Sequence, residues 1–178
     1  MFRRVLALLG SFAVLVTLAL PASAGTTTTF TLSAGSLTIS EPASTVNLGT
    51  VATGAPTITA LLGTVSVSDG RGTTLGSWTA SVSSTDFTTG GATSNETIAK
   101  ASLDYWSGAS TSNSGVGVFT PGQLLSANKQ TLGTSRTAFS ATALVGNNTQ
   151  AWNPTVVVNV PAAAVAGLYT GTITHSVA

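Results

Sequence analysis

The sequence contains no cysteine, and only 6% of its 178 residues carry a charge, whereas about 25% is usual in globular proteins. The absence of cysteine excludes disulfides, thiolate metal sites and thiol nucleophiles. Because charges are scarce, Ser, Thr, Asn and Gly must supply the polar surface, which suits neutral, hydrogen-bonding partners such as glycans or other proteins. Hydrophobic residues make up 43% of the chain, which is too many for an intrinsically disordered protein.

The first 24 residues have the three parts of a secretory signal peptide. A basic start at Arg3 and Arg4 precedes the apolar run Val5–Leu20, and small residues end at Ala24. We therefore expect cleavage after Ala24 and a secreted protein; a retained membrane anchor is the alternative, but it needs a longer apolar span. Cleavage removes two of the six basic residues and leaves a net charge of −1. Without a basic patch, binding to nucleic acid is not expected.

Residues 25–178 show short segments of alternating hydrophobicity, separated by Gly, Asn, Asp and Pro. This pattern predicts a single all-β domain, an antiparallel β-sandwich of about nine short strands. The Ser-, Gly- and Asn-rich tract Gly108–Gly117 is expected to be an exposed loop. The expected strands are Gly35–Ser40, Val46–Val51, Ile58–Ser68, Gly76–Ser84, Thr97–Trp106, Val116–Thr120, Arg136–Leu144, Thr155–Val160 and Leu168–Val177.

The stretch Val65–Ser84, VSVSDGRGTTLGSWTASVSS, has two alternating runs around an Asp-Gly-Arg-Gly segment. Asp-Gly is a strong hairpin signal and glycine permits positive φ, so we predict a tight turn there. Arg71 can then pair with Asp69, or lay its side chain over an aromatic ring. Alternation places Trp78 on the inner face of the second run, with threonines and serines opposite.

Little of the sequence is suited to catalysis. His175 is the only histidine, so a cluster of histidine metal ligands cannot form and a Ser-His-Asp triad would depend on this one residue. Alternation along the last strand puts His175 and Val177 on its inner face, away from substrate. The acidic residues stand singly, and a secreted hydrolase survives as an alternative only if distant acids converge. We expect a non-catalytic protein without metal or cofactor.

Tyr105 and Trp106 are consecutive in an expected strand and therefore point to opposite faces. If Tyr105 packs inward, Trp106 projects outward, where it can stack on a sugar ring or on a partner surface. The alternative is that a loop or the other sheet covers Trp106, since tryptophan is highly buried on average. The sequence leaves both possibilities open.

Three stretches in order, GSLTISEP, VSVSDGRGTTLGSWTASVSS and NPTVVVNVPAAAVAGLYTGTITHSVA, resemble the WxL domain, a secreted β-domain of Gram-positive bacteria. In that family an Asp-x-Arg-Gly turn precedes a first Trp-x-Leu motif, and a second motif closes the terminal strand. Asp69, Arg71 and Trp78 match the turn and the first tryptophan, while Ala80 replaces leucine. His175 and Val177 occupy the second motif, with histidine in place of tryptophan.

The resemblance implies non-covalent association with the cell wall, with peptidoglycan as the partner and the motif residues as the binding site. Our expectation is therefore a secreted, non-catalytic, wall-associated protein. No apolar tail follows Leu168–Ala178, so we expect no contact with the membrane after signal cleavage. The alternative is a structural or adhesive subunit that binds other secreted surface proteins, or itself, through strand edges that few charges guard.

Overall fold

The computed structural model describes residues 25–42 and 45–178, so the predicted signal peptide lies outside the described residues. Among the described residues, regular secondary structure falls within 33–178, one of the two units into which the chain divides, and residues 25–32 have none. In the described part, no helix has the length and apolar character that a membrane crossing requires.

The fold is all-β, as the alternating hydrophobicity predicts, and the helical segments of the described residues are three short 3₁₀ turns. The turns are η1 (Ser94–Glu96), η2 (Lys100–Ser102) and η3 (Ser126–Asn128). The strands are β1 (Leu37–Ser40), β2 (Thr57–Leu61), β3 (Val65–Ser84), β4 (Phe87–Thr88), β5 (Thr97–Ile98), β6 (Leu103–Trp106), β7 (Ser110–Pro121), β8 (Gln130–Thr131), β9 (Arg136–Trp152), β10 (Thr155–Asn159) and β11 (Ile173–Val177).

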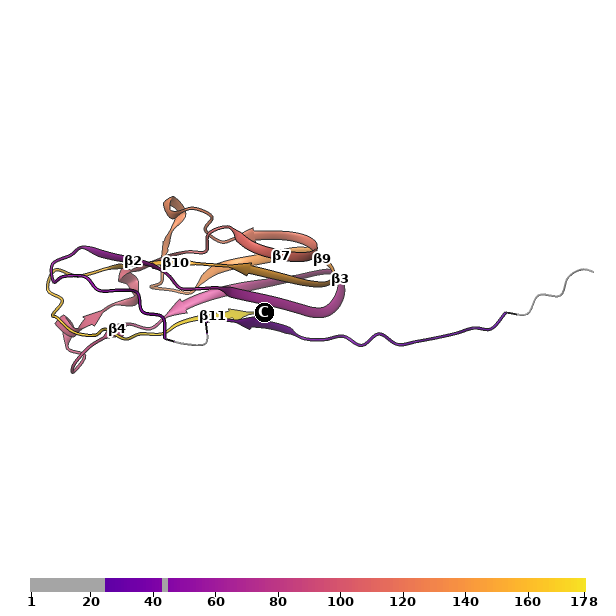
Figure 1. Cartoon of the computed structure of the whole chain (residues 1–178), viewed down its shortest axis with the longest axis horizontal. Coiled ribbons are helices and arrows are strands. Elements are labelled where there is room, and N and C mark those ends of the chain that lie inside the picture. Colours follow the sequence, from indigo (N-terminus) through magenta and orange to yellow (C-terminus); the bar gives the residue numbers. More distant parts are fainter. Residues whose placement is uncertain (1–24, 43–44) are drawn as a thin grey trace, which may run out of the picture. The chain divides into compact units, whose positions relative to one another are not determined.

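Antiparallel pairing joins these strands into two main sheets and a small two-stranded sheet (Figure 1). Sheet A has the order β1-β3-β9-β7, and β11 also pairs with β3, farther along that strand than β1. Sheet B has the order β2-β10-β6-β8, and β4 pairs with β5. One hydrophobic core takes side chains from both sheets, among them Val65, Trp78 and Phe139 from sheet A and Leu103 and Val156 from sheet B. The arrangement is therefore sandwich-like.

The predicted hairpin at Asp69–Gly72 is wrong. β3 continues through this segment as one strand and is paired with β9 on both sides of it, from Val65 opposite Trp152 to Val82 opposite Arg136. The two alternating runs are thus two arms of one strand. Register shifts lie between Asp69 and Thr73 and again before Trp78, which is where bulges let a paired strand bend.

The bend is sharp, because Arg71 Nη2 donates to the carbonyl oxygen of Ser77 at 2.8 Å. Six residues of extended strand would separate these positions by roughly 20 Å, far beyond the length of an arginine side chain. Each strand of the β3-β9-β7 ribbon has a glycine with positive φ near the bend: Gly72, Gly146 and Gly115. At Gly115 a Cβ atom would also lie 2.5 Å from the carbonyl oxygen of Asn147, so this position requires glycine.

Two further expectations are wrong. Gly108–Gly117 is mostly strand rather than loop, because β7 begins at Ser110. An edge strand with exposed side chains on both faces needs no alternation of apolar and polar residues, so its composition resembles that of a loop. Val46–Val51 forms no strand; it lies in the segment that connects β1 and β2.

Candidate functional site

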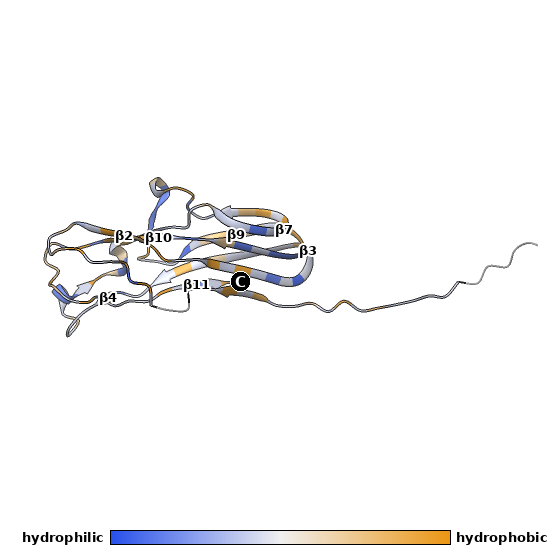
Figure 2. Ribbon diagram, viewed as in Figure 1, coloured by the Kyte–Doolittle hydropathy of each residue, from blue (hydrophilic) through white to orange (hydrophobic). Residues whose placement is uncertain are grey.

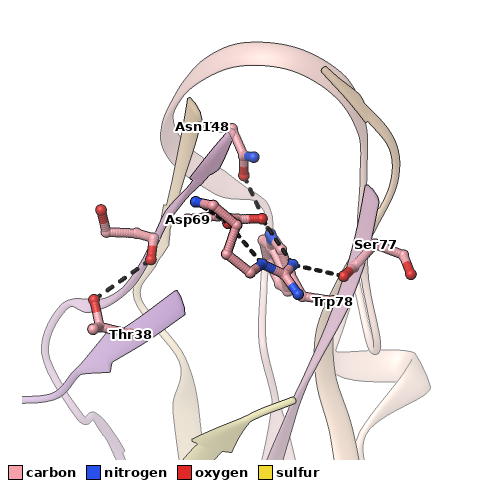
Figure 3. A network of polar contacts seen from close by, with 7 residues as sticks. Thr38, Asp69, Ser77, Trp78 and Asn148 are labelled. Atoms are coloured by element: carbon pink, nitrogen blue, oxygen red, sulfur yellow. Dashed lines mark hydrogen bonds and ion pairs between the residues drawn. The ribbon is translucent and has the colours of Figure 1, made fainter. Parts of the chain in front are cut away.

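Asp69 and Arg71, the predicted motif turn, form a charged pair at the bend of β3. Figure 3 labels Asp69 in this network of polar contacts. Arg71 donates from Nε to Asp69 Oδ1 and from Nη2 to Oδ2, both at 2.9 Å, and its backbone N–H donates to Oδ1 at 3.0 Å. The Asp69 side chain is 1% exposed and that of Arg71 is 32% exposed. The Arg71 guanidinium holds the pKa of Asp69 below its ordinary value, although burial opposes this. Of the two alternatives for Arg71, the pair with Asp69 is the one that the structure shows.

Trp78 lies on the inner face of β3, as alternation predicts, and is 2% exposed. Its indole Nε1 donates to Asn148 Oδ1 at 3.2 Å, and Asn148 is the residue opposite Asp69 in the β3-β9 ladder. The indole thus reaches from one arm of β3 to the part of β9 that pairs with the other arm (Figure 3). With the Arg71–Ser77 bond, these contacts hold the bend closed; we call Asp69, Arg71, Trp78 and Asn148 the bend lock.

The second motif stretch lies beside the first, because β11 pairs with the Ala80–Ser84 arm of β3. His175 is opposite Val82 and Val177 is opposite Ala80, and the backbone groups of Thr79 and Ala178 bond each other in both directions. His175 is buried, as predicted, and Val177 is half-buried. The fold thus brings the two motif stretches together, but as packed strands whose key side chains point into the protein.

His175 belongs to a buried chain of hydrogen bonds that the sequence did not reveal. Trp152 Nε1 donates to the Tyr105 hydroxyl at 3.3 Å, and that hydroxyl lies 3.0 Å from His175 Nε2. His175 Nδ1 lies 2.8 Å from Glu41 Oε1, which also accepts from the His175 backbone N–H. A carboxylate can only accept, so Nδ1 carries the proton and Nε2 accepts from Tyr105. Burial lowers the pKa of His175 below its ordinary 6.5, although Glu41 acts to raise it. The ring is therefore neutral at pH 7.

We expect the free energy of unfolding to fall as the pH is lowered from about 7 to 5. The pKa of His175 is below its ordinary 6.5 in the folded protein, so the unfolded chain binds the proton first and is favoured below that value. The effect levels off below the folded pKa. Urea unfolding across this range, compared between the wild type and His175→Gln, measures it. Equal slopes for the two proteins would contradict the assignment.

The site geometry bears on the chemistry that His175 can perform. Both ring nitrogens are engaged, by Glu41 and Tyr105, so neither is free to activate a serine. Among residues 25–42 and 45–178, no group of three or more His, Asp or Glu side chains is placed to hold a metal ion. His175 and Glu41 also line a largely apolar cavity of about 1020 Å³, whose other walls include Leu48, Val158 and Ile173.

Exposed and half-buried hydroxyls form rows on the outer faces of the two arms of sheet A, one row before the bend and two after it. Residues that pair across a sheet have their side chains on the same face, so the register defines each row. Ser114 and Thr149 are close enough for their hydroxyls to bond each other at 2.7 Å, and those of Ser81 and Ser176 at 2.9 Å. We call these the hydroxyl rows: Thr38-Ser68-Thr149-Ser114, Thr79-Ser140-Thr120 and Ser176-Ser81-Thr137. No charged residue belongs to them.

Trp106 ends β6 and is half-buried, whereas its neighbour Tyr105 is fully buried. The two rings therefore differ in exposure as opposite faces predict, and only part of the Trp106 side chain is open to a ligand. The third tryptophan, Trp152, was not singled out from the sequence, yet it lies at the centre of the core against Phe139, with ring centroids 5.1 Å apart.

No family model, curated protein or solved structure matches the chain. The resemblance to the WxL domain therefore stays a prediction that depends on the motif residues themselves.

Proposed function

We propose that the protein is a secreted, non-catalytic surface protein that associates non-covalently with the peptidoglycan of a bacterial cell wall. The observation that carries the proposal is the set of hydroxyl rows, which place neutral hydrogen-bonding groups at strand spacing over the outer face of each arm of sheet A. Neighbouring strands lie about 4.8 Å apart, so the rows offer repeated, shallow contacts. A polymer that engages many such contacts at once gains avidity although each contact is weak.

This proposal moves the binding site away from the motif residues. Trp78 and His175 are buried, so in this view they support the sheet that carries the rows and do not themselves touch the wall. The resemblance to a wall-binding family and the scarcity of charge support peptidoglycan over an ionic ligand.

The proposal predicts co-sedimentation with purified peptidoglycan sacculi, with little change on adding moderate salt because few charges take part. Replacing Thr79 and Thr120 together by alanine removes two hydroxyls of one row, and we expect about a fivefold or greater loss of affinity. The matched control replaces Thr57 and Thr59, two exposed threonines of β2 in sheet B, and should bind as the wild type does. A protein that stays in the supernatant, or equal losses in both variants, would contradict the proposal.

A further inference from the structure

β7 offers a long free edge. It ends sheet A, and no strand within the described part of the chain pairs with its outer side. It has twelve residues, more than any other edge strand of the sheets, and its sequence STSNSGVGVFTP contains no charge. Because β7 bends at Gly115, its edge has two parts, one before and one after this glycine. Proteins usually prevent such edges from pairing with another chain by means of charged side chains, prolines or bulges. In β7 only Pro121 at the end and the register shifts around Val116 could oppose such pairing.

An exposed apolar patch adjoins this edge where the ribbon bends. Val116 in β7 is opposite Val145 in β9, which is in turn opposite Thr74 in β3, next to Leu75. The end of sheet A near the labels β3, β7 and β9 shows hydrophobic segments in Figure 2. We call this the crest patch; its members are Leu75 (83% exposed), Val116 (62%), Val118 (58%) and Val145 (46%).

Leu75 is the most unusual member of the crest patch. Its φ is 59°, in the left-handed region that is unfavourable for a residue with a branched side chain. An apolar side chain that is strained and also exposed to water adds nothing to the stability of the isolated protein. Leu75 lies at the register shift between Thr74 and Gly76, and a bulge there accounts for its backbone conformation. The bulge explains the backbone but leaves the side chain exposed.

We propose that the free edge of β7 after Gly115 and the crest patch form a self-association surface, on which residues 116–121 of two copies pair antiparallel about a two-fold axis. About such an axis the same surface of both copies meets, so a strand without charges meets no repulsion. Pairing satisfies the free N–H and C=O groups of β7 and covers the neighbouring Val116 and Val118. A lipid bilayer would cover the apolar side chains but leave those backbone groups unpaired, so a second copy fits the surface better.

Sedimentation velocity over about a hundredfold range of concentration tests this surface. The wild type should show a reversible monomer–dimer equilibrium. Val116→Lys and Leu75→Lys each add a positive charge to the same surface of both copies and should raise the dissociation constant at least about tenfold. Leu168→Lys is the matched control, because Leu168 is 85% exposed but lies between β10 and β11, and it should dimerise as the wild type does.

Leu75→Gly separates folding from docking, since it relieves the backbone strain while removing the side chain. It should melt at the same or a higher temperature than the wild type and still dimerise more weakly. A wild type that is monomeric at every concentration would overturn the proposal, as would a control that loses dimerisation to the same extent as Leu75→Lys. Binding of the wild type, but not of Leu75→Lys, to phosphatidylglycerol vesicles without dimerisation would assign the patch to membranes and overturn it as well.

Discussion

Replacing Trp78 by alanine is expected to lower the free energy of unfolding by about 3–5 kcal/mol. The side chain is 2% exposed, its ring packs beside Phe119 at a centroid distance of 6.3 Å, and its N–H is bonded to Asn148. Alanine leaves a cavity at the bend and deprives the buried Asn148 oxygen of its donor. Urea unfolding followed by far-ultraviolet circular dichroism measures the loss.

Two variants make this expectation specific. Trp78→Phe keeps most of the ring volume but removes the N–H donor, so it should cost about 1–3 kcal/mol, less than alanine. Trp106→Ala removes a half-buried tryptophan from sheet B and should cost less than half as much as Trp78→Ala. If Trp106→Ala lowered the free energy of unfolding as much as Trp78→Ala, the bend lock would not contribute more to stability than an ordinary half-buried side chain.

Local alternation predicted the buried faces well. His175 lies inward because β11 pairs with β3 without a register shift. Trp78 shares the inner face with Ala80 and Val82, as a period of two predicts. Threonine and serine at the intervening positions indicated a neutral outer surface, which the hydroxyl rows provide. These features depend only on residues close together in the sequence.

The course of β3 could not be predicted in this way. Asp-Gly followed by glycine favours a hairpin when the two flanking runs pair with each other. Here both arms pair with β9 instead, so Asp69 lies opposite Asn148. A partner almost eighty positions away leaves no local signal. The same holds for Glu41, which contacts His175 from the region after β1.

Trp152 was missed for a different reason. Asn148, Gln150 and Trp152 alternate inward at the end of β9 and are all buried. Strand prediction relies on the alternation of apolar and polar residues. Because two of these three buried residues are polar, the inner face could not be recognised from apolar residues alone. A buried Asn or Gln beside a tryptophan in a strand is the signal that could have revealed this part of the core.

Replacing Arg71 by methionine is expected to lower the free energy of unfolding by about 2–3 kcal/mol. Removing one partner of a buried ion pair costs about 3–5 kcal/mol because the other charge stays buried, and the lower figure allows for the partial exposure of Arg71. The variant also loses the bond to the Ser77 carbonyl that closes the bend. Arg71→Lys keeps a positive charge without the two-pronged geometry and should fall between methionine and the wild type.

The double variant Asp69→Asn with Arg71→Met tests whether the loss of stability in Arg71→Met comes from the Asp69 carboxylate, which stays buried without its partner. With no buried charge left, it should recover most of the stability that Arg71→Met loses. Acid provides a second readout, because the folded pKa of Asp69 is lowered from 3.8. The contribution of the pair is complete above that value and disappears as the pH falls through the folded pKa. The gap between the wild type and Arg71→Met should therefore narrow in acid. A gap that stays constant, together with a double variant no more stable than Arg71→Met, would show that the pair does not hold the bend.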